Sequence, residues 1–257
     1  MSEITTSRET SRVEWVPVIF YYLLACGISW PFFYWRDIHP ESWQAWSAPG
    51  FVKTWSYMWG PGLSAIITLL VFRKRYIRTV TLFGTSAINS LAFWWLPWLL
   101  LMIPGGSDTG EGINPHLFPL MMGVLGFVTI LGEELGWRGF LDDALRSWPL
   151  WKRALLVGVL WEAWHFTTRT AHGTLAAVLL REAIILPVII VLSLIMSLSV
   201  RRSYSLTVAV AIHGWIDFLF EQPTKPVFIV FGITLVFWIF LLLRWDKTLG
   251  FIPARRN

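Results

Sequence analysis

The chain has 257 residues, of which 55% are hydrophobic and only 14% are charged, and its formal net charge is +5. An average soluble domain is about 25% charged, and a mean hydropathy of +0.57 exceeds what one soluble core of this length can bury. The composition excludes a disordered chain, a basic nucleic-acid-binding domain and an ordinary soluble enzyme. It predicts an all-α, polytopic membrane bundle in contact with the lipid bilayer, with no nucleic-acid partner.

Eight apolar blocks follow one another along the chain, and a membrane span needs about 20 mostly apolar residues. In chain order we expect helices from Val16 to Tyr34, from about Thr54 to Phe72, from Ala87 to Ile103, from near Leu117, from near Arg153, from about Ala183 to Val200, from Ser205 to Phe220, and from Val227 to Leu243. The sequence predicts a single transmembrane domain over 1–257, with a polar segment at 1–14 and a basic tail at 244–257.

The distribution of basic residues predicts how the chain is oriented, because cytoplasmic loops are enriched in Lys and Arg. With a cytoplasmic N-terminus and eight spans, all but five of the 21 basic residues fall in cytoplasmic segments. The five others are Arg36, Lys53, Arg169, Arg181 and Lys225. Both termini are therefore expected in the cytoplasm, in a multi-pass protein of a bacterial cell membrane without a signal peptide. The single Cys26 excludes an internal disulfide and a Cys-ligated zinc site.

Charged side chains in the fourth block are costly inside a membrane and are rarely idle there. Glu134 and Arg138 lie four residues apart, so on a helix they share one face and can neutralise each other. Glu133 points about 100° away and has no partner in its own helix. The alternative interpretation is a helix end at the cytoplasmic surface.

Two further groups lie in later apolar blocks. His165 follows Trp161 in the fifth block, and His213 shares a helix face with Asp217 in the seventh. As alternatives, His165 could be a core histidine bonded to a carbonyl, and His213 with Asp217 a self-satisfied pair.

Pro149 lies midway between Glu133 and His165 and disfavours continuation of a helix. A hairpin turning there would place the two side chains at equal height on neighbouring helices. The polar end of the fourth helix, with Asp142, Asp143 and Arg146, is expected to project into the cytoplasm. The site is then expected within the membrane, nearer the cytoplasmic face.

A carboxylate and an imidazole that converge in a water-poor cavity can hold and deprotonate a water molecule. A second imidazole with a neighbouring polar group can stabilise an oxyanion. This set is suited to amide hydrolysis without a covalent nucleophile. The same residue types could also ligate zinc or iron, so metal binding stays open at this point.

Taken together, Glu133-Glu134-x-x-x-Arg138, Trp161-x-x-x-His165 and His213-x-x-x-Asp217 resemble the CPBP family, which comprises CAAX prenyl endopeptidases and bacteriocin-processing (Abi) intramembrane proteases. The resemblance implies that Glu133 is the general base and that His165 helps to activate the water. His213 would stabilise the oxyanion, with Asp217 beside it, while Glu134 and Arg138 would be structural.

This resemblance also implies a membrane-embedded or lipidated peptide or protein substrate, and no metal or other cofactor. The sequence departs from the family pattern at two positions. Trp161 stands where Phe is common, and Asp217 stands where Asn is frequent. An ionised Asp accepts hydrogen bonds but cannot donate one, so Asp217 must either stay protonated or orient His213.

Three competing functions remain. Glu162-x-x-His165 has the spacing of a di-iron carboxylate site, although such sites need a second copy of the motif. Intramembrane ionisable residues also form proton relays in transporters, which usually show internal repeats, and no repeat is visible here. A catalytically silent membrane scaffold is the third alternative.

Overall fold

The computed structural model describes residues 13–72, 79–106, 112–167 and 174–245, and these residues are predominantly helical. Within them, the extended pairing is limited to an isolated bridge between Thr81 and Ser205. The expected all-α class is confirmed. The helices are α1 (Trp15–Ile38), α2 (Pro40–Ala45), α3 (Gly50–Met58), α4 (Gly60–Val71), α5 (Ala87–Leu101), α6 (Phe118–Gly136), the π-helical turn η2 (Trp137–Asp142), α7 (Leu150–Trp164), α9 (Leu175–Ser203), α10 (Leu206–Glu221) and α11 (Lys225–Leu243).

Each of the eight predicted blocks contains helix, but the second block is broken. It forms α3 and α4, which meet at Trp59. The cause is the sequence Gly60-Pro61-Gly62, because proline lacks an amide hydrogen and its ring clashes with the preceding turn of a helix. A single continuous helix from Thr54 to Phe72 is therefore wrong, although both halves remain helical.

Within the part of the chain that the structure describes, four helical segments are long and apolar enough to cross a bilayer: α1, α6 together with η2, α9 and α11. The apolar helices α4 and α5 are shorter, with 12 and 15 residues. Spans of this kind confirm the membrane class. The total of eight crossings and the cytoplasmic position of both termini stay predictions.

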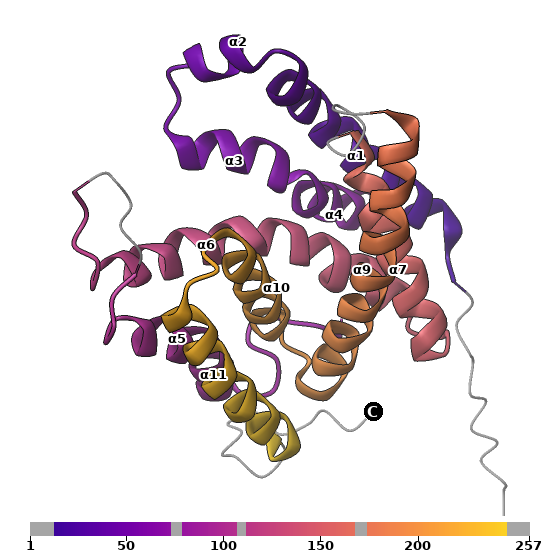
Figure 1. Cartoon of the computed structure of the whole chain (residues 1–257). Coiled ribbons are helices and arrows are strands. Elements are labelled where there is room, and N and C mark those ends of the chain that lie inside the picture. Colours follow the sequence, from indigo (N-terminus) through magenta and orange to yellow (C-terminus); the bar gives the residue numbers. More distant parts are fainter. Residues whose placement is uncertain (1–12, 73–78, 107–111, 168–173, 246–257) are drawn as a thin grey trace, which may run out of the picture.

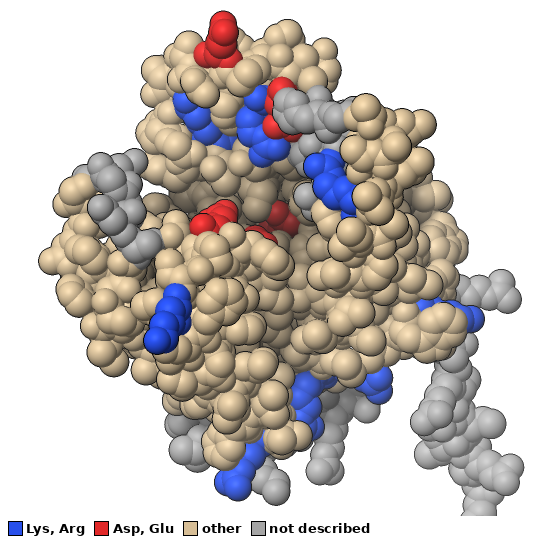
Figure 2. Space-filling model, in the orientation of Figure 1, with Lys and Arg blue, Asp and Glu red and all other residues tan. Residues whose placement is uncertain are grey.

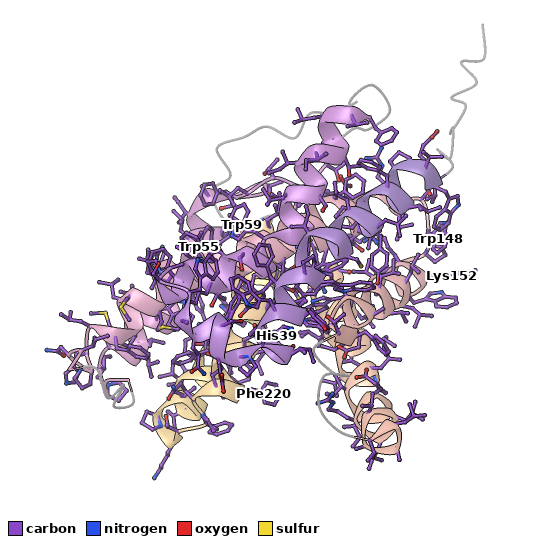
Figure 3. All side chains as sticks on the ribbon, turned by 90° about the horizontal axis from the view of Figure 1, so that it is seen from above. His39, Trp55, Trp59, Trp148, Lys152 and Phe220 are labelled. Carbon is purple, nitrogen blue, oxygen red and sulfur yellow. The ribbon has the colours of Figure 1, made fainter. Side chains whose placement is uncertain are left out.

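Helix α6 runs through the middle of the molecule and contacts α3, α4, α5 and α10 (Figure 1). Helix α7 packs along α9, and α11 packs against α5. Two indoles, one in α3 and one directly after its last residue, donate hydrogen bonds to α6. Trp55 donates to the hydroxyl of Thr129 at 2.8 Å, and Trp59 donates to the carbonyl of Val128 at 3.0 Å (Figure 3).

Close contact between α4 and α6 depends on glycine. A Cβ atom added to Gly62 would lie 2.5 Å from the carbonyl oxygen of Gly132. Small residues allow helix backbones in membranes to approach closely in this way. Gly132 directly precedes Glu133 and Glu134, so this contact fixes the part of α6 that carries both carboxylates.

The polar end of the fourth block does not project from the protein. Asp142 and Asp143 are buried, with 3% and 4% exposure. Asp142 lies 2.8 Å from the Nε atom of Arg153 and accepts a hydrogen bond from Ser197, while Asp143 accepts hydrogen bonds from Thr79. Partners on other segments therefore satisfy both carboxylates inside the fold, while the position of this end on the cytoplasmic side of the membrane stays a prediction.

Candidate active site

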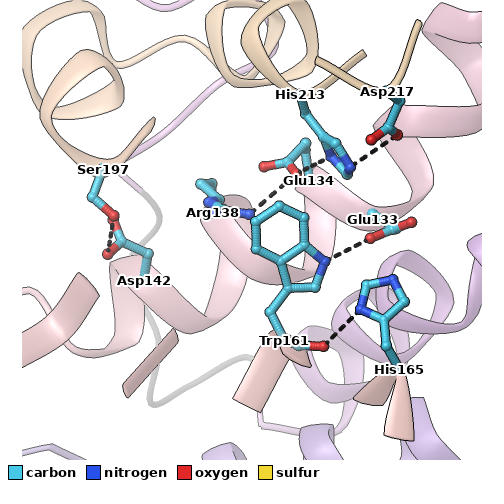
Figure 4. A network of polar contacts seen from close by, with 9 residues as sticks. All are labelled: Glu133, Glu134, Arg138, Asp142, Trp161, His165, Ser197, His213 and Asp217. Atoms are coloured by element: carbon cyan, nitrogen blue, oxygen red, sulfur yellow. Dashed lines mark hydrogen bonds and ion pairs between the residues drawn. The ribbon is translucent and has the colours of Figure 1, made fainter. Parts of the chain in front are cut away.

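Glu133 lies near the C-terminal end of α6 and is 1% exposed. Its Oε2 atom accepts a hydrogen bond of 2.9 Å from the indole Nε1 of Trp161 on α7 (Figure 4). An N–H donor stabilises the ionised form of a carboxylate. Glu133 is thus a buried carboxylate held from a neighbouring helix, as its orientation away from Arg138 suggested.

One carboxylate oxygen of Glu134 contacts two side chains, those of Arg138 and His213. Its Oε1 atom lies 3.1 Å from an Nη1 atom of Arg138 and 2.7 Å from Nδ1 of His213 on α10. The side chains of Glu134 and Arg138 are both fully buried. The predicted Glu134–Arg138 pair is confirmed, but the contact with His213 was not expected from the sequence.

His213 lies between two carboxylates. Its Nε2 atom is 3.2 Å from Oδ2 of Asp217, one helical turn further along α10. The His213 side chain is 5% exposed, whereas that of Asp217 is 43% exposed. An imidazolium satisfies this arrangement by donating a hydrogen bond at each nitrogen. Asp217 is therefore placed to orient His213 by accepting from Nε2.

His165 follows the last residue of α7 and is joined to the other groups through Trp161. Its Nδ1 atom lies 3.1 Å from the carbonyl oxygen of Trp161. A carbonyl only accepts, so Nδ1 carries the hydrogen in this contact and Nε2 of the neutral ring is an acceptor. Pro149 directly precedes α7, as the predicted hairpin requires. Glu133 and His165 line the same cavity, so the hairpin brings the two side chains together.

This cavity has a volume of about 580 Å³ and two chemically different walls. The polar wall consists of Glu133, Trp161, His165, His213 and Asp217. The opposite wall is aliphatic and comes mainly from α9, with Ile184, Ile185, Val188, Ile189 and Leu192. Figure 2 shows acidic side chains at the bottom of a hollow in the molecular surface that faces the viewer. The aliphatic wall was not predicted, because nothing in the sequence of this apolar stretch of α9 associates it with the site.

The arrangement can activate water and stabilise a developing negative charge. Among the described residues, no group of three or more His, Cys, Asp or Glu side chains is suited to hold a metal ion. Glu162, which suggested a di-iron alternative, is buried, and its Oε2 atom lies 3.9 Å from Nδ1 of His165. The absence of a metal cofactor stays a prediction that metal analysis can test.

Comparison with known proteins identifies the same segment of the chain. Residues 115–219 match the family model described as type II CAAX prenyl endopeptidase Rce1-like, and this range contains every predicted site residue. A protein of Methanococcus maripaludis named CAAX prenyl protease 2 is 38% identical over 76 residues. That alignment covers 26% of this chain and 27% of the relative, so the chain spans about a quarter of the length of this curated protein.

Proposed function

Because these matches support the CPBP family of CAAX proteases that the motifs resemble, we propose that this chain is an intramembrane endopeptidase of the glutamate type. The observation that carries the proposal is the convergence of Glu133, His165 and His213 on one cavity with an aliphatic opposite wall. The three side chains come from α6, the end of α7 and α10.

In the proposed reaction, Glu133 removes a proton from a water molecule, with Nε2 of His165 as a second acceptor that holds this water. The water oxygen attacks the scissile carbonyl carbon. The two electrons of the carbonyl π bond move to its oxygen, which becomes an oxyanion. A positioned general base typically contributes about 10²- to 10⁴-fold to such a step.

His213 is proposed to stabilise the oxyanion through Nε2–H. Glu134 accepts from Nδ1, which fixes the orientation of the ring, and Asp217 holds Nε2 until the oxyanion forms. When the tetrahedral intermediate collapses, the carbon–nitrogen bond breaks and Glu133 returns its proton to the leaving amine. The products are a carboxylic acid and an amine, so protons and electrons balance.

The aliphatic wall favours an apolar substrate. A polar peptide bond must lie against Glu133 and His213, while Val188, Ile189 and Leu192 on α9 form an apolar surface. Burial of a hydrocarbon group on such a surface contributes about 25 cal/mol per Å². We therefore propose a membrane-embedded or lipidated peptide or protein as substrate.

The test uses purified protein in lipid nanodiscs and a synthetic lipidated peptide. The wild type is expected to release two fragments, one with a new carboxylate that carries one ¹⁸O atom after reaction in H₂¹⁸O. Glu133→Gln is expected to bind the peptide without cleaving it, while Glu221→Gln, a matched change outside the cavity, keeps the wild-type rate. Full cleavage by Glu133→Gln would overturn the proposal, as would a stoichiometric iron pair in the purified protein.

A further inference from the structure

Trp161 contacts three residues of the candidate site on other segments: Glu133 on α6, Arg138 on η2 and His213 on α10. Its indole N–H donates to Glu133 at 2.9 Å, and the guanidinium of Arg138 lies 4.4 Å from the centre of its ring. Its ring centroid is 4.9 Å from that of His213. Trp161 is 1% exposed and lies in the centre of the network in Figure 4.

From these contacts we infer that Trp161 is a positioning residue for Glu133. The inference rests on the proposed function, because it assigns Trp161 a part in the activation of water. A glutamate side chain has rotatable bonds that would let its carboxylate turn away from the cavity. The indole donor binds Oε2 and directs the carboxylate, so that Oε1 is presented for the water.

Indole suits this role because it is a donor only. It cannot remove the proton from the water and cannot accept a hydrogen bond in place of Glu133. A hydrogen bond to a charged group is also stronger than one between neutral groups. The bond therefore both orients the carboxylate and stabilises the ionised form that a general base requires.

Burial alone does not explain this contact. Other tryptophans in the described residues are equally buried, yet their Nε1 atoms make no hydrogen bond; these are Trp98, Trp137, Trp164 and Trp215. Burial of an indole in this fold therefore does not by itself bring its N–H to an acceptor among the described residues. At position 161 the N–H points at the carboxylate proposed to act as the base, and the backbone carbonyl of the same residue holds His165.

Phenylalanine at position 161 tests the inference, because it keeps an aromatic ring and removes the N–H. Trp215→Phe is the matched control, since it removes a buried indole N–H that has no acceptor in the described residues. Trp161→Phe is expected to lower kcat by at least about tenfold with little change in KM. The rising limb of its pH–rate profile should move to higher pH, because the carboxylate loses a donor to its ionised form.

An infrared titration without substrate separates this inference from the proposed function. The signal of Glu133 is obtained by subtracting the spectrum of a protein that carries Glu133→Gln from the spectrum of the same protein with Glu133. In Trp161→Phe the midpoint of this signal is expected at higher pH than in wild type, and in Trp215→Phe it is expected unchanged. If the wild type cleaves no peptide, the proposed function fails, but the shift in midpoint still decides the role of Trp161.

A second replacement covers the case in which Trp161→Phe does not fold. Site-specific incorporation of 3-benzothienyl-alanine keeps the shape of the ring system and replaces N–H by sulfur. The same upward shift of the Glu133 midpoint is expected. An unchanged midpoint, in either folded variant, would overturn the inference and reduce Trp161 to a packing residue.

Discussion

Arg138 and Glu134 form a fully buried ion pair at 3.1 Å, and we predict that Arg138→Met strongly destabilises the fold. Methionine retains an unbranched apolar side chain but removes the guanidinium, which leaves the Glu134 carboxylate with His213 as its remaining described partner. Removing one member of a buried pair costs about 3–5 kcal/mol. Because His213 still holds Glu134, we expect a loss near the lower limit, about 3 kcal/mol, which is more than a hundredfold in the folded-to-unfolded ratio.

The assay is reversible unfolding by SDS in mixed micelles, followed by far-ultraviolet circular dichroism. Arg202→Met is the control, because Arg202 is exposed and donates at the surface to the carbonyl of Leu242; its effect should stay within about 0.5 kcal/mol. The double variant Glu134→Gln/Arg138→Met should recover at least half of the loss, since no stranded charge remains. A loss below about 1 kcal/mol for Arg138→Met, or no recovery in the double variant, would refute this reasoning.

Three further predictions concern chemistry, packing and metal dependence. His213→Gln should lower kcat by about 10²- to 10³-fold and change KM by a smaller factor in steady-state cleavage assays. A rise in KM as large as the fall in kcat would contradict a role on the oxyanion. Gly62→Ala should destabilise by about 1–3 kcal/mol in the SDS assay, because its Cβ would lie 2.5 Å from Gly132, whereas Gly27→Ala, with open space around it, should not. Exhaustive dialysis against EDTA should leave cleavage unchanged, and a loss restored by one divalent metal would contradict the metal-free mechanism.

Local periodicity predicted much of the fold and part of the site. Long apolar blocks mark the helices, and the four-residue spacing of Glu134 with Arg138 and of His213 with Asp217 predicted both pairs that the structure contains. The break at Trp59 had a signal in Gly60-Pro61-Gly62, but the continuous apolar composition suggested a single span.

Contacts between distant segments could not be predicted in the same way. Glu134 and His213 are 79 positions apart, and no spacing rule connects residues on α6 and α10. The indole of Trp161 was noticed only as a departure from a family pattern, since its hydrogen bond depends on how α7 packs beside α6. The burial of Asp142 likewise depends on Arg153 and Ser197, which lie on other helices.

The most direct test of the proposed mechanism is the single-turnover cleavage rate of Glu133→Gln in nanodiscs, measured with the dissociation constant for the same lipidated peptide. Loss of the general base should slow cleavage by about 10³-fold or more and leave the dissociation constant within a few-fold of wild type. A cleavage rate within tenfold of wild type would contradict the account, because water activation would then not depend on Glu133.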